Sequence, residues 1–243
     1  MNNKWFSEAK DKGSEMRFFC FPYAGAGTTV YTEWAKCIDM DFFPVSYPMR
    51  EKRRRDPMPL SIKELAYTAA IENEKVFTEK PAIFYGHCEG GIIAYETAVA
   101  VQKIYGISPK IFVISGVNPP CKPLRISVEE TMNLEEASAK FVELGFIPKQ
   151  FAKNQTYLKC FVPVLIEDFI LFQKYCDTDY IKLNCHIFEI HGKDDISLDM
   201  EGLSDWGKYT DQITHKVYEG EHFFINNKNL PEIMKDIRGL IDG

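Results

Sequence analysis

Residues 83–94 read Ile83-Phe84-Tyr85-Gly86-His87-Cys88-Glu89-Gly90-Gly91-Ile92-Ile93-Ala94. A short apolar run leads into a glycine-flanked turn and then into a helix-forming stretch, so we predict a strand, a sharp turn and a helix with Cys88 at the apex. A side chain at Gly86 or Gly90 would crowd the backbones of strand and helix, which explains the flanking glycines. This pattern is typical of a nucleophile elbow that carries a thiol in place of the usual hydroxyl.

The glycine-flanked cysteine is weak evidence by itself. Free cysteine is among the most often buried residue types, so a merely structural thiol at Cys88 is the competing interpretation. A thiol nucleophile needs a base, and the base needs a carboxylate that orients it. In folds with this elbow the chain order is nucleophile, acid, histidine. We expect the neighbouring His87 to pack rather than to catalyse, so a later histidine has to supply the base.

Both partners occur in that order, each directly after an apolar run. Residues 191–196 read HGKDDI and offer two carboxylates. We favour Asp195, three residues after the glycine that ends the strand, and Asp194 is the alternative. For either one the competing interpretation is a turn residue that bonds to its own backbone. Residues 219–225 read EGEHFFI and place His222 at a predicted helix start. The candidates therefore follow strand ends, where open α/β sheets place their sites.

Length and composition indicate one substantial domain. The chain has 243 residues, of which 45% are hydrophobic and 26% are charged, enough to bury a single large core. Its seven cysteines show no C-x-x-C spacing, so we expect no disulfide framework, no metal site and a reducing compartment. Residues 1–17 are polar and lack the apolar core of a leader, and no apolar run is long enough to span a bilayer. We therefore expect a cytoplasmic protein that does not enter a membrane.

The formal net charge of −6 argues against nucleic acid as a partner. Residues 50–55 (REKRRR) are a local exception, with five positive charges in six residues after a strand-like run. Two interpretations of this basic run stand. It contacts phosphate or an acidic protein surface, or it is a solvated loop of the ordinary kind.

The order of the expected elements indicates an α/β fold with a mainly parallel, doubly wound sheet. The continuous apolar character of residues 82–85 and 111–114 suits strands that are covered on both faces. The predicted strands are residues 17–22, 42–47, 82–86, 110–115, 185–190 and 214–218, and the predicted helices are residues 30–37, 61–77, 90–105, 199–209 and 230–241.

The alternation of strands and helices stops between about residues 118 and 183. A proline-rich run at residues 118–123 ends it, and helix-like stretches at 134–144 and 162–175 follow without a strand between them. We predict an inserted helical lid within a single domain of residues 1–243. Its apolar side chains either pack the lid on the sheet or line an acyl pocket. They include Phe141, Leu144, Phe146, Phe161, Leu165, Phe169, Leu171 and Phe172.

Several stretches match one family in order along nearly the whole chain: residues 19–27 (FCFPYAGAG), Trp34, residues 47–50 (YPMR), the elbow at 86–91, residues 163–175, the Asp195 loop with Trp206, and residues 220–224 (GEHFF). Together these stretches resemble the type II thioesterases of nonribosomal peptide and polyketide synthesis. The resemblance implies an α/β-hydrolase fold with a mobile lid, acting on thioesters held on the phosphopantetheine arm of an acyl or peptidyl carrier protein. It implies no cofactor of the protein's own, because the phosphopantetheine belongs to the carrier-protein substrate, and we expect a monomer.

Carried over position by position, the resemblance places the family's catalytic triad on Cys88, Asp195 and His222. It places the oxyanion-hole donors on two backbone N–H groups. One belongs to Ala24, in the loop after the first strand, and the other to Glu89, which follows the nucleophile.

The sequence departs from the family's pattern at three positions. The family usually has serine where Cys88 stands, methionine or a similar residue at Glu89, and histidine at Tyr23. A cysteine makes the acyl-enzyme a thioester, which stays activated, so water can resolve it and an amine, alcohol or thiol can also accept the acyl group. A Glu89 carboxylate would oppose a neighbouring thiolate unless it points away, so we assign a role only to the Glu89 backbone.

We therefore predict a thioesterase that cleaves acyl or aminoacyl thioesters through a Cys-His-Asp triad and an acyl-cysteine intermediate. Acyl transfer to another acceptor is the alternative within this mechanism. The elbow also resembles that of dienelactone hydrolases, which use a cysteine triad on small lactones, but the first loop and the lid fit that family poorly. A carrier-binding protein without activity is a third alternative, in which Cys88 marks a decayed site; the intact Asp195 and His222 count against it.

Overall fold

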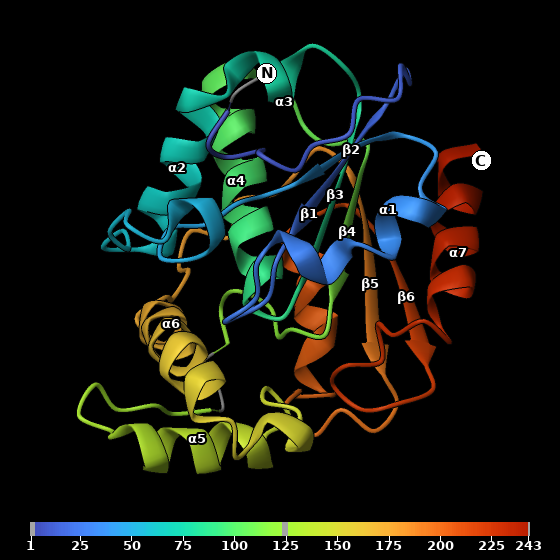
Figure 1. The fold of residues 1–243 in the computed structure, drawn as a ribbon. Coiled ribbons are helices and arrows are strands. Elements are labelled where there is room, and N and C mark those ends of the chain that lie inside the picture. The colour runs from blue at the N-terminus through green and yellow to red at the C-terminus, as the bar shows by residue number, and fades with distance from the viewer. Residues whose placement is uncertain (1–2, 123–125, 243) are drawn as a thin grey trace.

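The computed structural model describes residues 3–122 and 126–242 of the chain. Figure 1 shows a central sheet with helices on both faces. Among the described helices, none combines the length and the apolar character needed to cross a bilayer. The strands are β1 (Arg17–Phe21), β2 (Asp41–Pro44), β3 (Ala82–His87), β4 (Ile111–Ser115), β5 (His186–Gly192) and β6 (Gln212–Tyr218). The α-helices are α1 (Trp34–Cys37), α2 (Ile62–Glu72), α3 (Glu74–Thr78), α4 (Glu89–Tyr105), α5 (Leu134–Glu143), α6 (Gln155–Gln173) and α7 (Leu230–Asp242), and the 3₁₀ helices are η1 (Thr28–Tyr31), η2 (Glu51–Arg53), η3 (Lys149–Phe151) and η4 (Gly202–Lys208).

The six strands run parallel in the order β2-β1-β3-β4-β5-β6. Strand β3, which leads into the elbow, pairs with β1 on one side and with β4 on the other, so it lies inside the sheet. Every predicted strand is present, with bounds that differ by a few residues. The predicted α/β fold with a parallel sheet is confirmed, and its parallel strands bring their carboxyl ends to one end of the sheet.

Side chains along the strands alternate between two cores with the period of two that a strand imposes. On one face Phe19 and Phe84 pack in the core that α2, α3 and α4 complete. On the other face Phe18 and Tyr85 pack with α1 and α7, and the Trp34 ring lies 4.2 Å from the Tyr85 ring between centroids. Figure 1 shows these two groups of helices on opposite sides of the sheet. The prediction of strands covered on both faces is confirmed.

Three predicted helices differ from the structure. The predicted helix 30–37 is divided into the 3₁₀ helix η1 (Thr28–Tyr31) and the four-residue helix α1 (Trp34–Cys37). The predicted helix 61–77 is two helices, because Asn73 leaves helical geometry and its Nδ2 donates to the Ala69 carbonyl oxygen at 2.7 Å. Asparagine competes in this way with helix propagation through its own side chain. The predicted helix 199–209 is the 3₁₀ helix η4, whose short sequence contains two glycines that disfavour an α-helix.

The segment between β4 and β5 contains α5, η3 and α6, in the place where the sequence predicts a lid (residues 118–183). The two α-helices pack together through phenylalanine rings: the ring centroids of Phe141 and Phe146 lie 5.4 Å and 5.0 Å from that of Phe169. Figure 1 shows both helices beyond the carboxyl ends of the strands. Residues 123–125 of the predicted lid lie outside the described residues.

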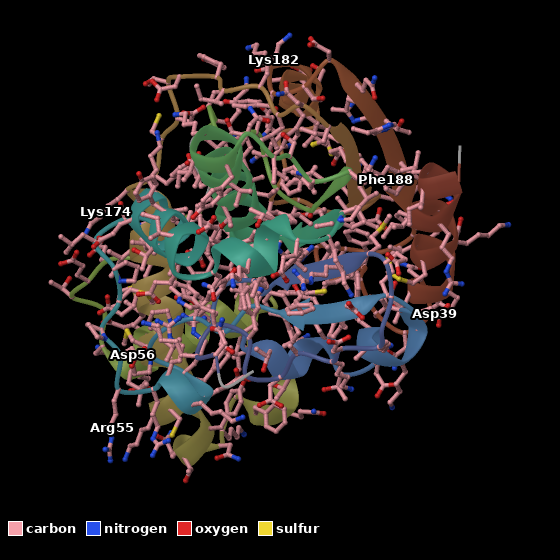
Figure 2. The ribbon with its side chains drawn as sticks, turned by 90° about the horizontal axis from the view of Figure 1, so that it is seen from above. Asp39, Arg55, Asp56, Lys174, Lys182 and Phe188 are labelled. Carbon is pink, nitrogen blue, oxygen red and sulfur yellow. The ribbon has the colours of Figure 1, made fainter. Side chains whose placement is uncertain are left out.

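The basic run at residues 50–55 is divided between the interior and the surface. Arg50 and Arg53 are buried, with 7% and 6% of their surface exposed. Arg53 donates to the Asp56 carboxylate at 2.8 Å, whereas Arg55 points outward at the surface (Figure 2). Both interpretations of the run are wrong for Arg50 and Arg53, because their charges are compensated inside the protein.

Candidate active site

Cys88 stands at a sharp turn between β3 and α4, as the sequence predicts. Its φ of 53° and ψ of −131° are strained values for a residue other than glycine. A Cβ on Gly86 would lie 2.3 Å from the Gly90 carbonyl oxygen, and a Cβ on Gly90 would lie 2.2 Å from the Phe21 carbonyl oxygen. The close approach of backbones therefore explains both glycines. The Cys88 N–H donates to the Ser115 carbonyl oxygen at 2.9 Å and fixes the turn to β4.

Asp195 and His222 come from the loops after β5 and β6. Nδ1 of His222 lies 2.8 Å from Oδ2 of Asp195, which is 5% exposed. Oδ1 of Asp195 accepts from the Ser197 N–H at 3.0 Å and from the Ser197 hydroxyl at 2.6 Å. Burial raises the pKa of Asp195, but hydrogen bonds from His222 and Ser197 outweigh burial and lower it below its usual value. Of the two candidate acids, Asp195 contacts the histidine and Asp194 is exposed.

Cys88 and His222 line the same small cavity. Nε2 of His222 is buried and has no hydrogen-bond partner among the described residues, and the negative charge of a Cys88 thiolate acts on this ring. Burial lowers the pKa of His222, but Asp195 and Cys88 raise it to about 10 through hydrogen bonds and negative charge. An imidazolium next to a thiol stabilises the thiolate, which is the nucleophilic form. The arrangement can therefore move a proton from sulfur to nitrogen.

His87 lies next to His222 but is not one of the three candidate catalytic residues. Its Nδ1 is 2.9 Å from the Ser115 hydroxyl, and its ring centroid is 4.8 Å from that of His222. Burial, together with the nearby charge of His222, lowers the pKa of His87 well below its usual value. A neutral, fully buried ring fits the packing role that the sequence predicts for His87.

The two predicted oxyanion donors lie at the start of α4 and in the loop after β1. Glu89 is the first residue of α4. Its backbone N–H is one of the first four N–H groups of the helix, which have no carbonyl partner within the helix, and it lies at the positive end of the helix dipole. Ala24 is fully buried. No space for a Cβ remains between Gly90 and the carbonyl oxygens of Phe21 and Pro22, so the elbow packs directly on the start of the Ala24 loop.

The Glu89 side chain is buried rather than solvated. It is 1% exposed, and its Oε1 has no hydrogen-bond partner among the described residues. Burial raises the pKa of Glu89 well above its usual value, the charge of Asp168 adds to this, and Arg50 opposes it. A carboxyl group held in its neutral form does not repel a thiolate at Cys88. The expected conflict between these neighbours is therefore avoided by burial.

Sequence reasoning missed a buried ion pair next to the Ala24 loop. Arg50 donates to both carboxylate oxygens of Asp168 in α6, at 2.7 Å and 2.5 Å, and the Gly25 N–H donates to the same carboxylate at 2.6 Å. One signal was present: Asp168 is an acid in the apolar stretch 162–172, and a buried charge needs a partner. The partner itself is 118 residues away, beyond any local pattern.

One cavity contains Cys88 and His222, and a second lies along the loop after β1. The cavity lined by Cys88 and His222 has a volume of about 30 Å³, and Phe169 and Phe172 of α6 form part of its wall. A second cavity of about 680 Å³ runs along the loop of residues 23–27 and is also lined by aromatic residues of α6. Among the described residues, no group of three or more His, Cys, Asp or Glu side chains is arranged to hold a metal ion.

Comparison with known proteins gives one family match and several relatives. The family model for the thioesterase domain matches residues 16–241. Thioesterase PikA5 of Streptomyces venezuelae is 26% identical over 230 residues, which is 92% of this chain and 80% of that protein. The gramicidin S biosynthesis protein GrsT of Aneurinibacillus migulanus is 25% identical over 227 residues, which is 92% of this chain and 88% of that protein.

Two solved structures have closely similar folds. ClbQ from the colibactin NRPS/PKS pathway has a TM-score of 0.86 at 23% identity, covering 94% of this chain and 98% of that chain. The type II thioesterase BorB from the borrelidin biosynthetic cluster has a TM-score of 0.85 at 22% identity, covering 98% of each chain. These likenesses agree with the α/β fold and parallel sheet described above.

Proposed function

Because this chain belongs to the thioesterase domain family and is a hydrolase that acts on thioesters, we propose that it removes acyl or aminoacyl groups from the phosphopantetheine arm of an acyl or peptidyl carrier protein. The names of its relatives support this substrate class, since one is a gramicidin S biosynthesis protein and another comes from an NRPS/PKS pathway. In this proposal the enzyme uses no cofactor of its own and works as a monomer in the cytoplasm.

One observation carries the proposed mechanism: Cys88 and His222 line one cavity, and His222 is bonded at 2.8 Å to the buried Asp195. A nucleophile, a base and an orienting carboxylate are the parts that acyl transfer through a covalent intermediate requires. We assign these three roles to Cys88, His222 and Asp195. Ser197 holds the second oxygen of Asp195 and so keeps the carboxylate aligned with the imidazole.

In the first half-reaction, the Cys88 thiolate attacks the carbonyl carbon of the carrier-bound thioester. The N–H groups of Ala24 and Glu89 hold the resulting oxyanion, and one such donor contributes about 10²–10³ in rate. The tetrahedral intermediate then breaks its bond to the pantetheine sulfur, and the imidazolium of His222 gives that sulfur its proton. The carrier leaves with a free thiol, and the acyl group remains as a thioester of Cys88.

In the second half-reaction, the neutral His222 takes a proton from water as the water oxygen attacks the acyl group. The same two N–H groups hold the oxyanion again. Cys88 leaves as a thiolate next to the new imidazolium, and the free acid is released. Asp195 accepts a hydrogen bond from Nδ1–H of the imidazole, which keeps Nε2 available for the reacting proton.

Substrate entry requires movement of the cavity wall. A volume of about 30 Å³ holds roughly one water molecule, so an acyl group does not fit until the wall opens. Helix α6 forms part of this wall, and we propose that residues 118–183 act as the lid that opens it.

Acyl transfer is the second candidate function, and the sulfur of Cys88 favours it. Exchange of one thioester for another conserves most of the activation of the acyl group, whereas a serine would convert it into a less reactive oxygen ester. An amine, alcohol or thiol that enters the open site can therefore compete with water for the acyl group.

Replacing Cys88 by serine separates hydrolysis from transfer. We expect Cys88→Ser to keep some hydrolysis and to lower the fraction of acyl group transferred to an added amine at least about tenfold, because the intermediate becomes an oxygen ester. The measurement is the ratio of amide to free acid, by mass spectrometry, with and without the amine. An unchanged ratio would show that the sulfur is incidental to the outcome.

The proposed function as a whole is tested with a panel of acyl-pantetheine and acyl-carrier thioesters. We expect release of free acid, with kcat/KM higher for the carrier-bound form than for the same acyl group on free pantetheine, since the carrier adds binding energy. Turnover of simple lactones in preference to every thioester would instead support the dienelactone hydrolase alternative. Binding of the carrier without turnover would support the decayed-site alternative.

A further inference from the structure

Helix α6 contributes one buried carboxylate to the loop that follows β1. Asp168 is 3% exposed, and its Oδ2 accepts both the Gly25 N–H at 2.6 Å and Nη1 of Arg50 at 2.7 Å. Its Oδ1 accepts from Nη2 of Arg50 at 2.5 Å. The same guanidinium donates to the Ala26 carbonyl oxygen at 2.9 Å and to the Pro48 carbonyl oxygen at 3.0 Å. One ion pair therefore holds the loop at two successive residues.

These contacts directly follow Ala24, the proposed oxyanion donor. Gly25 has a φ of 76°, which redirects the chain just after the Ala24 peptide. Asp168 fixes the Gly25 N–H, and Arg50 fixes the Ala26 carbonyl, so the loop is held immediately beyond the donor. The direction in which the Ala24 N–H points then depends on a residue that belongs to the predicted lid.

The packing of α6 on the loop is as close as the hydrogen bonding. A Cβ on Gly25 would lie 2.8 Å from Cζ of Phe161 and 2.9 Å from Cδ1 of Leu165. Both residues belong to α6, which also forms part of the wall of the cavity that contains Cys88. Docking of α6 therefore closes the cavity and fixes the loop at the same time.

Stability alone is a weak reason for this ion pair. Taking two charges out of water costs about as much as their attraction returns, and well-packed apolar residues often replace a buried pair without loss of stability. A carboxylate that also accepts a backbone N–H, however, specifies the position of that backbone. The pair is suited to alignment more than to stabilisation.

We propose that Asp168 is a positioning residue that aligns the Ala24 N–H through Gly25 and Arg50, so that the oxyanion hole is complete only when α6 is docked. This inference rests on the proposed function for the identity of the donor. It gives a reason for the charged Asp168 in the buried part of α6. It also means that the site can be acylated efficiently only when α6 closes it.

The test compares two reactions of Cys88 that differ in their need for an oxyanion hole. Acylation by p-nitrophenyl acetate passes through an oxyanion. Its rate is measured from the burst of p-nitrophenolate that acylation releases. Alkylation by iodoacetamide displaces iodide at a saturated carbon and forms no oxyanion. Asp168→Asn is the direct variant, but it leaves the buried Arg50 without its full counter-charge and can unfold the protein. The second variant, Asp168→Leu with Arg50→Met, removes both charges and keeps apolar volume.

We expect the acylation rate of the folded variants to fall about 10- to 100-fold, because a misplaced oxyanion donor costs on that order. The alkylation rate should stay within about threefold, since the thiolate and its access are unchanged. The control is Lys174→Gln, which removes the exposed Lys174–Glu130 ion pair (3.1 Å) at the end of α6 and should leave both rates unchanged (Figure 2 shows Lys174 at the surface).

Two outcomes would overturn the inference. Acylation of the double variant at nearly the rate of the unaltered protein would show that Asp168 does not align the loop. An equal loss of acylation and alkylation would show a general structural effect on Cys88. Failure of the proposed function looks different: acyl-pantetheine thioesters would not be hydrolysed, while acylation by p-nitrophenyl acetate would still depend on Asp168.

Discussion

Cys88→Ala is expected to lower kcat for an acyl-pantetheine thioester by at least about 10⁴-fold, since loss of the nucleophile of a triad leaves only binding and the oxyanion hole. Nε2 of His222 has no hydrogen-bond partner among the described residues, and we propose that Cys88, which lines the same cavity, gives it a proton. Thermal unfolding of the variant should stay close to that of the unaltered protein, because one small buried side chain replaces another. The measurement is steady-state release of free thiol.

A matched control and a chemical probe accompany this variant. Cys37→Ala changes an exposed cysteine in α1 and should leave kcat unchanged. Iodoacetamide near neutral pH should modify Cys88 much faster than the other six cysteines, because a thiolate reacts and a thiol does not. Activity of Cys88→Ala within tenfold of the unaltered protein would mean that another group is the nucleophile. Uniform reactivity of all the cysteines would contradict an activated thiol at position 88.

Asp195→Asn is expected to lower kcat by about 10²–10⁴-fold, while Asp194→Asn leaves it within about threefold. Asp195 is buried and bonds to Nδ1 of His222 at 2.8 Å, whereas its neighbour Asp194 is exposed. An asparagine at position 195 keeps the shape but can present its amide N–H to Nδ1, which favours the wrong tautomer of the imidazole. The measurement is the pair of kcat values on one thioester. Equal losses in the two variants, or a larger loss at position 194, would remove Asp195 from the triad.

The same substitution should change how stability depends on pH. The pKa of His222 is raised from 6.5 to about 10 in the folded protein, so the charged ring contributes stability that is complete below pH 6.5 and is lost as pH rises through about 10. Asp195→Asn removes one cause of that raised pKa. The variant should therefore be destabilised most near pH 6, and its difference in free energy of unfolding from the unaltered protein should shrink towards pH 10. Urea unfolding at several pH values measures this.

The elements that the sequence predicts well are those with a strong local signal. Most of the strands were identifiable because they are short apolar runs, whereas β6 has the more polar sequence QITHKVY. The elbow was identifiable because Gly86 and Gly90 are required sterically. The break at Asn73 was missed, because a single asparagine within a helix-forming stretch does not reveal whether its side chain bonds to the backbone. The local sequence pattern predicts the order of the elements, but side-chain contacts determine where each element ends.

The parts of the site that could not be predicted depend on contacts between distant segments. Local motifs identified Cys88 and His222, but nothing in the sequence shows that Arg50 reaches Asp168 across 118 residues. The basic run at 50–55 was interpreted as surface charge for the same reason. Glu89 is a second example. Its residue type predicts a negative charge, whereas burial raises the pKa of its carboxyl group and favours the neutral form. Burial is a property of the fold and is not visible in residue type.

We propose that acyl groups pass through a thioester on Cys88, and a rapid-quench experiment can detect this intermediate. The protein is mixed with an excess of acyl-pantetheine, quenched in acid within milliseconds, digested and analysed by mass spectrometry. The account predicts one added acyl group on the peptide that contains Cys88, appearing before free acid accumulates and decaying as the acid forms. Free acid formed at the full rate with no acyl group on Cys88 at any time would contradict it.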